Sequence, residues 1–175
     1  MNRSRSRTAA LALALVVASV SAACGDDDGP VGLDREVVVG TYNLTALSFD
    51  PQGSIPEADL LARFPNPQLI LTSNNSAQLA YLDPSTNLVV TVQGTYATTV
   101  NGVRIDLAAN SGYQQLLFSR RMEFVFDASA RTLTFDADAP DGVSRARLVA
   151  LVPSLANEQL LDPTPGRLRI VFTRP

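Results

Sequence analysis

Carboxylate side chains are the main groups in this chain that could carry out chemistry, because the sequence contains no histidine. Acidic pairs occur close together at Glu57 and Asp59, at Asp136 and Asp138, and at Asp138 and Asp141. A pair of this kind can serve general acid–base catalysis or bind calcium. We interpret the first pair as the solvated start of a helix and the other two as parts of a solvated turn.

The absence of histidine excludes several catalytic designs. No Ser-His-Asp triad, Cys-His pair or histidine metal site can be built from this composition. The sequence also lacks a glycine-rich phosphate-binding loop. We therefore expect that the protein is not an enzyme and that it uses neither a metal ion nor a cofactor.

The single cysteine, Cys24, follows a segment with the layout of a secretory signal. Residues 1–8 are polar and carry three arginines, residues 9–20 are almost entirely Ala, Leu and Val, and residues 21–23 are small. A charged start, a short apolar centre and a small-residue cleavage site are the three parts of such a signal. Residues 1–23 are therefore predicted to be a signal peptide, since the apolar run is too short for a stable membrane span.

The segment from Val20 to Cys24 resembles the lipobox of bacterial lipoproteins, in which the cysteine is diacylated and becomes the mature N-terminus. Ala22, Ala23 and Cys24 match that pattern, whereas Ser21 stands where the family usually has an aliphatic residue. The resemblance implies lipidation at Cys24 after Sec-type export, with the protein anchored to a membrane of the bacterial cell envelope. Ordinary signal-peptide cleavage is the alternative, because Ser21 and Ala23 also suit it.

Residues 24–35 are rich in Asp, Gly and Pro and are predicted to be a tether between an anchor and the domain of residues 36–175. That domain is long enough to fold around its own core. From Cys24 onward, 11 arginines stand against 17 acidic residues. This acidic balance excludes nucleic acid as an expected partner, because phosphate contacts need a basic surface.

Alternating apolar and polar residues dominate the domain and indicate half-buried strands. Short turns join most of them, which favours antiparallel pairing. We expect an all-β fold of eight or nine strands with one or two short helices, at 56–64 and within 154–166. An up-and-down barrel is the preferred architecture and a two-sheet sandwich is the alternative. The expected strands are 38–46, 69–72, 78–82, 88–96, 103–107, 122–127, 132–137, 146–152 and 168–174.

Both ends of this domain resemble the lipocalins. Gly40-Thr41-Tyr42 is similar to the Gly-x-Trp entry of that family, and Phe172-Thr173-Arg174 is similar to its arginine-bearing last strand. The resemblance implies that Arg174 packs across the first-strand aromatic, so that Gly40, Tyr42 and Arg174 close one end of a barrel. A buried guanidinium also needs such partners, because an unpaired buried charge is costly.

Inward-facing aromatic residues are the expected ligand contacts of this barrel. The resemblance implies a cavity for a small apolar ligand, and the alternative is a solid barrel whose partner is another envelope protein. Arg120-Arg121 could contact an anionic ligand or a lipid headgroup, although we interpret the pair as part of a solvated loop. The candidate ligand-binding residues are Tyr42, Tyr96, Phe124, Phe126 and Phe135.

Overall fold

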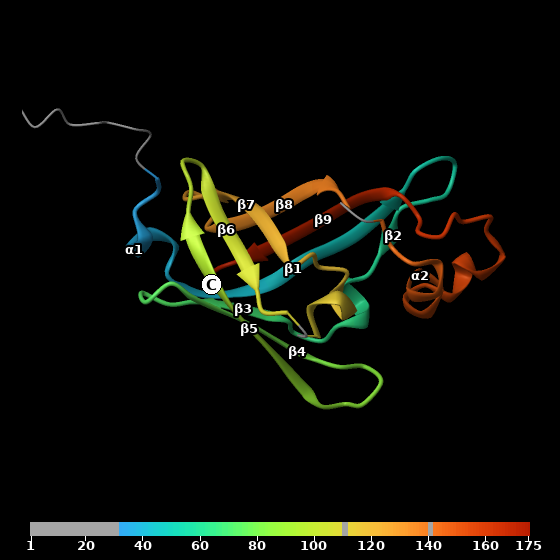
Figure 1. Ribbon diagram of the computed structural model, residues 1–175, viewed down its shortest axis with the longest axis horizontal. Helices are drawn as coiled ribbons and strands as arrows, with labels where there is room; N and C mark the ends of the chain where they lie inside the picture. Colours follow the sequence, from blue (N-terminus) through green and yellow to red (C-terminus); the bar gives the residue numbers. More distant parts are fainter. Residues whose placement is uncertain (1–31, 110–111, 140–141) are drawn as a thin grey trace, which may run out of the picture.

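The computed structural model describes residues 32–109, 112–139 and 142–175. These residues form a closed antiparallel barrel with short helices at its ends (Figure 1). The strands are β1 (Gly40–Pro51), β2 (Ala58–Asp59), β3 (Gln68–Leu71), β4 (Ser76–Leu82), β5 (Val89–Thr98), β6 (Gly102–Leu107), β7 (Arg121–Asp127), β8 (Thr132–Asp138) and β9 (Gly166–Thr173). Strand β1 pairs with β3, the strands from β3 to β9 pair in chain order, and β9 pairs with β1, which closes an eight-stranded barrel and excludes the two-sheet sandwich. The short strand β2 is an extra strand that pairs with β1. The predicted all-β barrel is confirmed.

The two ends of the barrel differ because of the alternating direction of the strands. Short turns after β3, β5 and β7 lie at the same end as helix α1 (Arg35–Val38) and the C-terminus (Figure 1). Longer connections at the other end carry helix α2 (Arg145–Leu151) and three 3₁₀ segments. These segments are η1 (Leu61–Arg63), η2 (Gly112–Leu116) and η3 (Pro153–Asn157). Within the described residues, no helix is long and apolar enough to cross a bilayer.

A β-bulge in β1 changes which residues face the core. The pairing of β1 with β9 shifts between Leu44 and Ala46, so that Leu47 and Phe49 point inward after Leu44. Strict alternation along 38–46 predicts that Ala46 shares the buried face of Tyr42 and Leu44; this prediction is wrong, because an extra residue in one strand reverses the alternation beyond it.

Two predicted elements have a different secondary structure. Residues 146–152 were expected as a strand but form helix α2, which Ser144 caps by accepting a hydrogen bond from the backbone N–H of Arg147. Strand β8 already pairs with β9, so no place is left for a strand between them. The expected helix at 56–64 is reduced to β2 followed by η1.

Side chains from all eight barrel strands fill the interior. Tyr42, Phe49, Leu69, Leu133 and Phe172 are among its fully or almost fully buried residues. The 3₁₀ segment η2 adds Leu116, and Phe118 follows it into the core, where its ring meets that of Phe172 edge-on at 6.1 Å. This segment thus closes the barrel at the end opposite α1.

Candidate functional site

The predicted barrel-closing residues meet at the α1 end. Arg174 donates hydrogen bonds from Nη1 to the carbonyl oxygens of Val39 (3.0 Å) and Val37 (3.3 Å), at the C-terminal end of α1. Gly40 has a φ of +154°, and a Cβ atom there would lie 2.9 Å from Cδ of Arg174. Glycine is thus required both by the backbone conformation and by the close approach of the arginine.

Tyr42 is fully buried beside this contact and bonds to α1 from the barrel interior. Its hydroxyl donates a hydrogen bond to the carbonyl oxygen of Val38 at 2.8 Å. Burial raises the pKa of the Tyr42 hydroxyl, and the charge of Arg174 opposes that shift. The structure therefore brings together Gly40, Tyr42 and Arg174, the three residues selected from the sequence.

The predicted ligand-binding aromatics are packed against one another or bonded to the backbone. The ring of Phe124 lies 6.0 Å from those of Phe135 and Phe172, measured between centroids. Tyr96 donates its hydroxyl hydrogen bond to the carbonyl oxygen of Thr72 at 2.8 Å, and Phe126 is half-buried. A void between Phe124, Phe172 and their neighbours has a volume of about 10 Å³. Such a void is at the lower limit for one water molecule.

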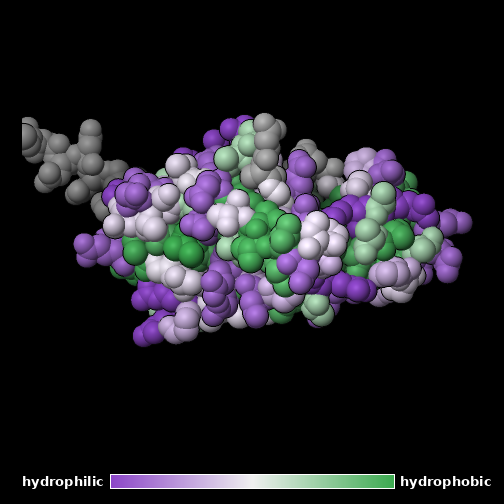
Figure 2. All heavy atoms as spheres, turned by 90° about the horizontal axis from the view of Figure 1, so that it is seen from below, coloured by the Kyte–Doolittle hydropathy of each residue, from purple (hydrophilic) through white to green (hydrophobic). Residues whose placement is uncertain are grey.

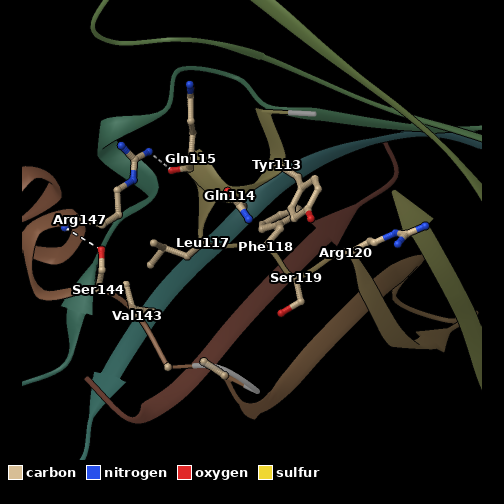
Figure 3. A pocket seen from close by; sticks show the side chains of 12 residues that line it. Tyr113, Gln114, Gln115, Leu117, Phe118, Ser119, Arg120, Val143, Ser144 and Arg147 are labelled. Carbon is tan, nitrogen blue, oxygen red and sulfur yellow. Dashed lines mark hydrogen bonds between the residues drawn. The ribbon is translucent and has the colours of Figure 1, made fainter. Parts of the chain in front are cut away.

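A much larger pocket lies at the other end of the barrel, where η2 meets α2 (Figure 3). We call it the mouth pocket; its volume is about 530 Å³, within the range of small-molecule sites. It is lined by Tyr113, Gln114, Gln115, Leu117, Phe118, Ser119, Arg120, Ala139, Gly142, Val143, Ser144 and Arg147. Phe118, two residues after η2, lines both the mouth pocket and the interior void, so its side chain lies between the two spaces.

Arg147 forms one wall of the mouth pocket from the first turns of α2. It donates a hydrogen bond from Nη2 to the carbonyl oxygen of Gln115, while its Nε is buried with no partner among the described residues. Burial lowers the pKa of the guanidinium, and the nearby Tyr81 and Asp83 oppose that shift. The pocket wall therefore holds a partly desolvated positive charge.

Tyr81 holds the η2 segment in place beneath Arg147. Its hydroxyl lies 2.8 Å from the carbonyl oxygen of Gly112 and 2.8 Å from the side-chain oxygen of Gln115. Burial raises the pKa of Tyr81 to about 12. The backbone of Leu117 next to this segment is left-handed, with a φ of 60°, a conformation that costs a non-glycine residue about 1 to 2 kcal/mol. The shape of the pocket thus depends on a constrained loop.

Only one arginine of this site was predicted from the sequence as a possible ligand contact. Arg120 was singled out as a possible anion contact, and the structure places it on the rim of the mouth pocket. Arg121, its neighbour, instead points to the outer wall, where its Nε lies 2.6 Å from Oδ1 of Asp106. The contribution of Arg147 was missed, because residues 146–152 were expected to be a strand.

The acidic pairs lie apart from the mouth pocket as far as they are described. Asp136 accepts a charge-assisted hydrogen bond from Arg167 at 2.5 Å across β8 and β9. Asp59 accepts one from the backbone N–H of Leu61 at the start of η1. Together with Glu57, it borders a groove of about 340 Å³ on the outer wall. Asp141 lies outside the described residues. Among those described, no cluster of three or more potential metal ligands occurs.

The signal peptide of residues 1–23, Cys24 and most of the predicted tether lie outside the described residues. The last tether residues are held against the barrel, since the backbone N–H of Leu33 donates to the carbonyl oxygen of Thr99 at 2.9 Å. A Cβ atom on Gly32 would also lie 3.4 Å from the backbone oxygens of Thr98 and Thr99. The chain therefore joins the barrel at the α1 end, opposite the mouth pocket.

A scan against protein-family models found no match to this chain, and a search of curated proteins found no significantly similar sequence.

Proposed function

We propose that this protein is a lipid-anchored component of the bacterial cell envelope that binds a small, largely apolar molecule in the mouth pocket, at the end of the barrel opposite α1. The observation that carries the proposal is the difference in volume between the void in the barrel interior and the mouth pocket. The void among the interior aromatics holds about 10 Å³, whereas the mouth pocket offers about 530 Å³. Leu117, Phe118 and Val143 supply apolar contacts there. The ligand site is thus proposed at the mouth of the barrel rather than among the interior aromatics.

The anchor is proposed at Cys24, after Sec-type export and removal of residues 1–23. The position of Gly32 at the α1 end supports this arrangement, since a tether leaving that end directs the mouth pocket away from the membrane. Metabolic labelling with palmitate in a bacterial host tests the anchor. We expect label on the wild type and on Ser21→Leu, which completes the lipobox pattern, and none on Cys24→Ser. An unlabelled wild-type protein contradicts the anchor.

The ligand site is tested with a neutral fluorescent probe, the methyl ester of 11-(dansylamino)undecanoic acid. The exported chain carrying Cys24→Ser is used, so that neither an acyl chain nor detergent competes for the probe. Gln114→Trp places a large ring in the mouth pocket and is expected to weaken binding about tenfold or more. Gln93→Trp, on the exposed outer side of β5, is the matched control and is expected to leave binding unchanged. Equal binding by both variants contradicts a mouth site.

The second candidate function is that of a structural or assembly protein: its own barrel is solid, and it binds another envelope protein. The filled interior favours it, and so does the hairpin of β4 and β5, which projects from the barrel in Figure 1. Leu88 and Val89 at its tip are 66% and 71% exposed. Apolar side chains also reach the surface on the face drawn in Figure 2. Loss of a cross-linked envelope protein in Leu88→Ser/Val89→Ser, with probe binding unchanged, would favour this candidate.

A further inference from the structure

We infer that the mouth pocket recognises a small anionic amphiphile, whose carboxylate or phosphate group is bound by Arg147, while the charge of Arg120 on the rim adds to the attraction. This inference rests on the proposed function, since it names the ligand class of the same site. Three observations support it: the charges that line the pocket, the partly buried guanidinium of Arg147 with its unpartnered Nε, and the apolar residues that lie between the two arginines.

The charges of the mouth pocket are unbalanced. Its lining includes two guanidinium groups, and no carboxylate occurs among the described lining residues. Elsewhere in the barrel, Arg121 and Arg167 form ion pairs with Asp106 and Asp136. The Arg120 side chain has no ion-pair partner in the described part of the chain, although it is adjacent to Arg121. A pocket whose described lining carries positive charge and no carboxylate favours an anion.

Arg147 is the stronger of the two anion contacts. It is half-buried, it bonds one carbonyl oxygen, and its Nε has no partner among the described residues. Asp83 lies near enough to influence it but beyond ion-pair distance, and Oδ1 of Asp83 already accepts the N–H and hydroxyl of Ser85 at 2.8 and 2.6 Å. A desolvated charge without a close counter-ion is costly, and an anionic ligand relieves that cost.

The apolar contacts indicate that the anion carries a hydrocarbon or aromatic body. Figure 3 shows Leu117 and Phe118 between Arg147 on one side and Arg120 on the other. Val143 borders the same space from the start of the α2 segment. A ligand that fills this space can place its anionic group at Arg147 and its body against the apolar side chains, whereas Arg120 extends outward at the rim. Inorganic phosphate alone would leave those apolar contacts unused.

A matched pair of probes tests the inference on the exported Cys24→Ser chain. The probes are 11-(dansylamino)undecanoic acid and its methyl ester, which share one body and differ by the negative charge. We expect the acid to bind about tenfold more tightly than the ester, since charge-assisted hydrogen bonds are roughly twice as strong as neutral ones. Dodecyl phosphate is expected to displace the acid at a concentration at least about tenfold lower than inorganic phosphate.

Three variants identify the groups responsible. Arg147→Gln is expected to weaken binding of the acid by about three- to tenfold and Arg120→Gln by about two- to threefold, and both should leave binding of the ester unchanged. Arg121 carries the same charge at the neighbouring position, but its side chain forms an ion pair with Asp106. Arg121→Gln is therefore expected to change the binding of neither probe. Circular dichroism melts establish that each variant is folded. If Arg147→Gln unfolds, the comparison of Arg120→Gln with its neighbour Arg121→Gln still tests the inference.

The outcomes separate this inference from the proposed function. If neither probe binds, the proposed ligand-binding function fails. If acid and ester bind equally, or if Arg121→Gln weakens the acid as much as Arg120→Gln does, the ligand site stands and anion recognition is overturned. If inorganic phosphate competes as well as dodecyl phosphate, the apolar part of the inference is overturned.

Discussion

Arg174, after the last strand, donates a hydrogen bond to the carbonyl oxygen of Val39, just before the first strand, across 135 positions of sequence. The same guanidinium nitrogen reaches Val37, so the end of β9 is fastened to the C-terminal end of α1. Helix carbonyls at this end lack partners within the helix and carry partial negative charge. One side chain therefore satisfies the end of a helix and covers one end of the barrel.

Replacement of Arg174 by alanine should destabilise the barrel. The variant loses two charge-assisted hydrogen bonds to backbone carbonyls, and we expect the free energy of unfolding to fall by about 1 to 3 kcal/mol. Urea denaturation followed by circular dichroism measures the change. Arg63→Ala, at an exposed position of η1, removes an arginine elsewhere and should alter stability by less than about 0.5 kcal/mol. Equal effects of the two variants would refute a closing role for Arg174.

Gly40→Ala should be destabilising for two separable reasons. The backbone φ of +154° is strained for alanine, and the new Cβ would press on Cδ of Arg174. We expect a loss of about 2 to 4 kcal/mol in urea denaturation. Gly53→Ala, with a φ of +110° and open space around it, carries the strain without the contact and should cost less. In an Arg174→Ala background the cost of Gly40→Ala should shrink, since the contact is gone.

Phe124→Ala should produce the largest loss of stability among single substitutions in β7. The ring is 3% exposed and packs against Phe135 and Phe172, so its removal leaves a cavity. The expected cost is about 3 to 5 kcal/mol. Val125→Ala alters the next residue of the same strand, which is 62% exposed, and should cost less than about 1 kcal/mol. Thermal melts of both variants make the comparison, and similar melting temperatures would count against a tightly packed interior.

Stability should fall above about pH 10. The described domain has no lysine, histidine or cysteine, so tyrosine is the type of side chain that titrates between about pH 6 and 12. Burial raises the pKa values of Tyr42, Tyr81 and Tyr96 above 10.0, to about 12 for Tyr81. The unfolded chain therefore ionises first, and stability that is complete below pH 10 is lost as the pH rises through the folded-state values.

The measurement is urea denaturation at intervals between pH 7 and 12. Stability should be nearly constant to about pH 9.5 and then decline. Tyr81→Phe loses the contacts of its hydroxyl with Gly112 and Gln115, so it is less stable throughout, but its decline above pH 10 should be shallower than that of the wild type. An unchanged slope in this variant would rule out Tyr81 as a contributor.

The barrel was predictable because its strands alternate strictly between apolar and polar residues. That pattern was correct for most of β3 to β9, since a side chain in a strand of a closed barrel faces either the core or solvent. It was insufficient in two places. The first place is β1, where the bulge reverses the alternation after Leu44. The second is helix α2: the spacing of Ala146, Leu148 and Ala150 fits a strand, but Leu148 and Leu151 are buried on one face of the helix. A short apolar run is compatible with both periods.

The sequence by itself determined the strand-rich class and the acidic balance, because these depend on residue type and on its alternation. The meeting of Gly40, Tyr42 and Arg174 was implied by the resemblance to the lipocalins, and it required a closed sheet, which the sequence left open against a sandwich. Only the tertiary structure decided that the interior is filled and that the mouth pocket holds Arg120 and Arg147. A cavity is the volume left over after packing, and it depends on how η2 and α2 are placed across the barrel end. No local pattern specifies that placement, because the residues that define it are far apart in the chain.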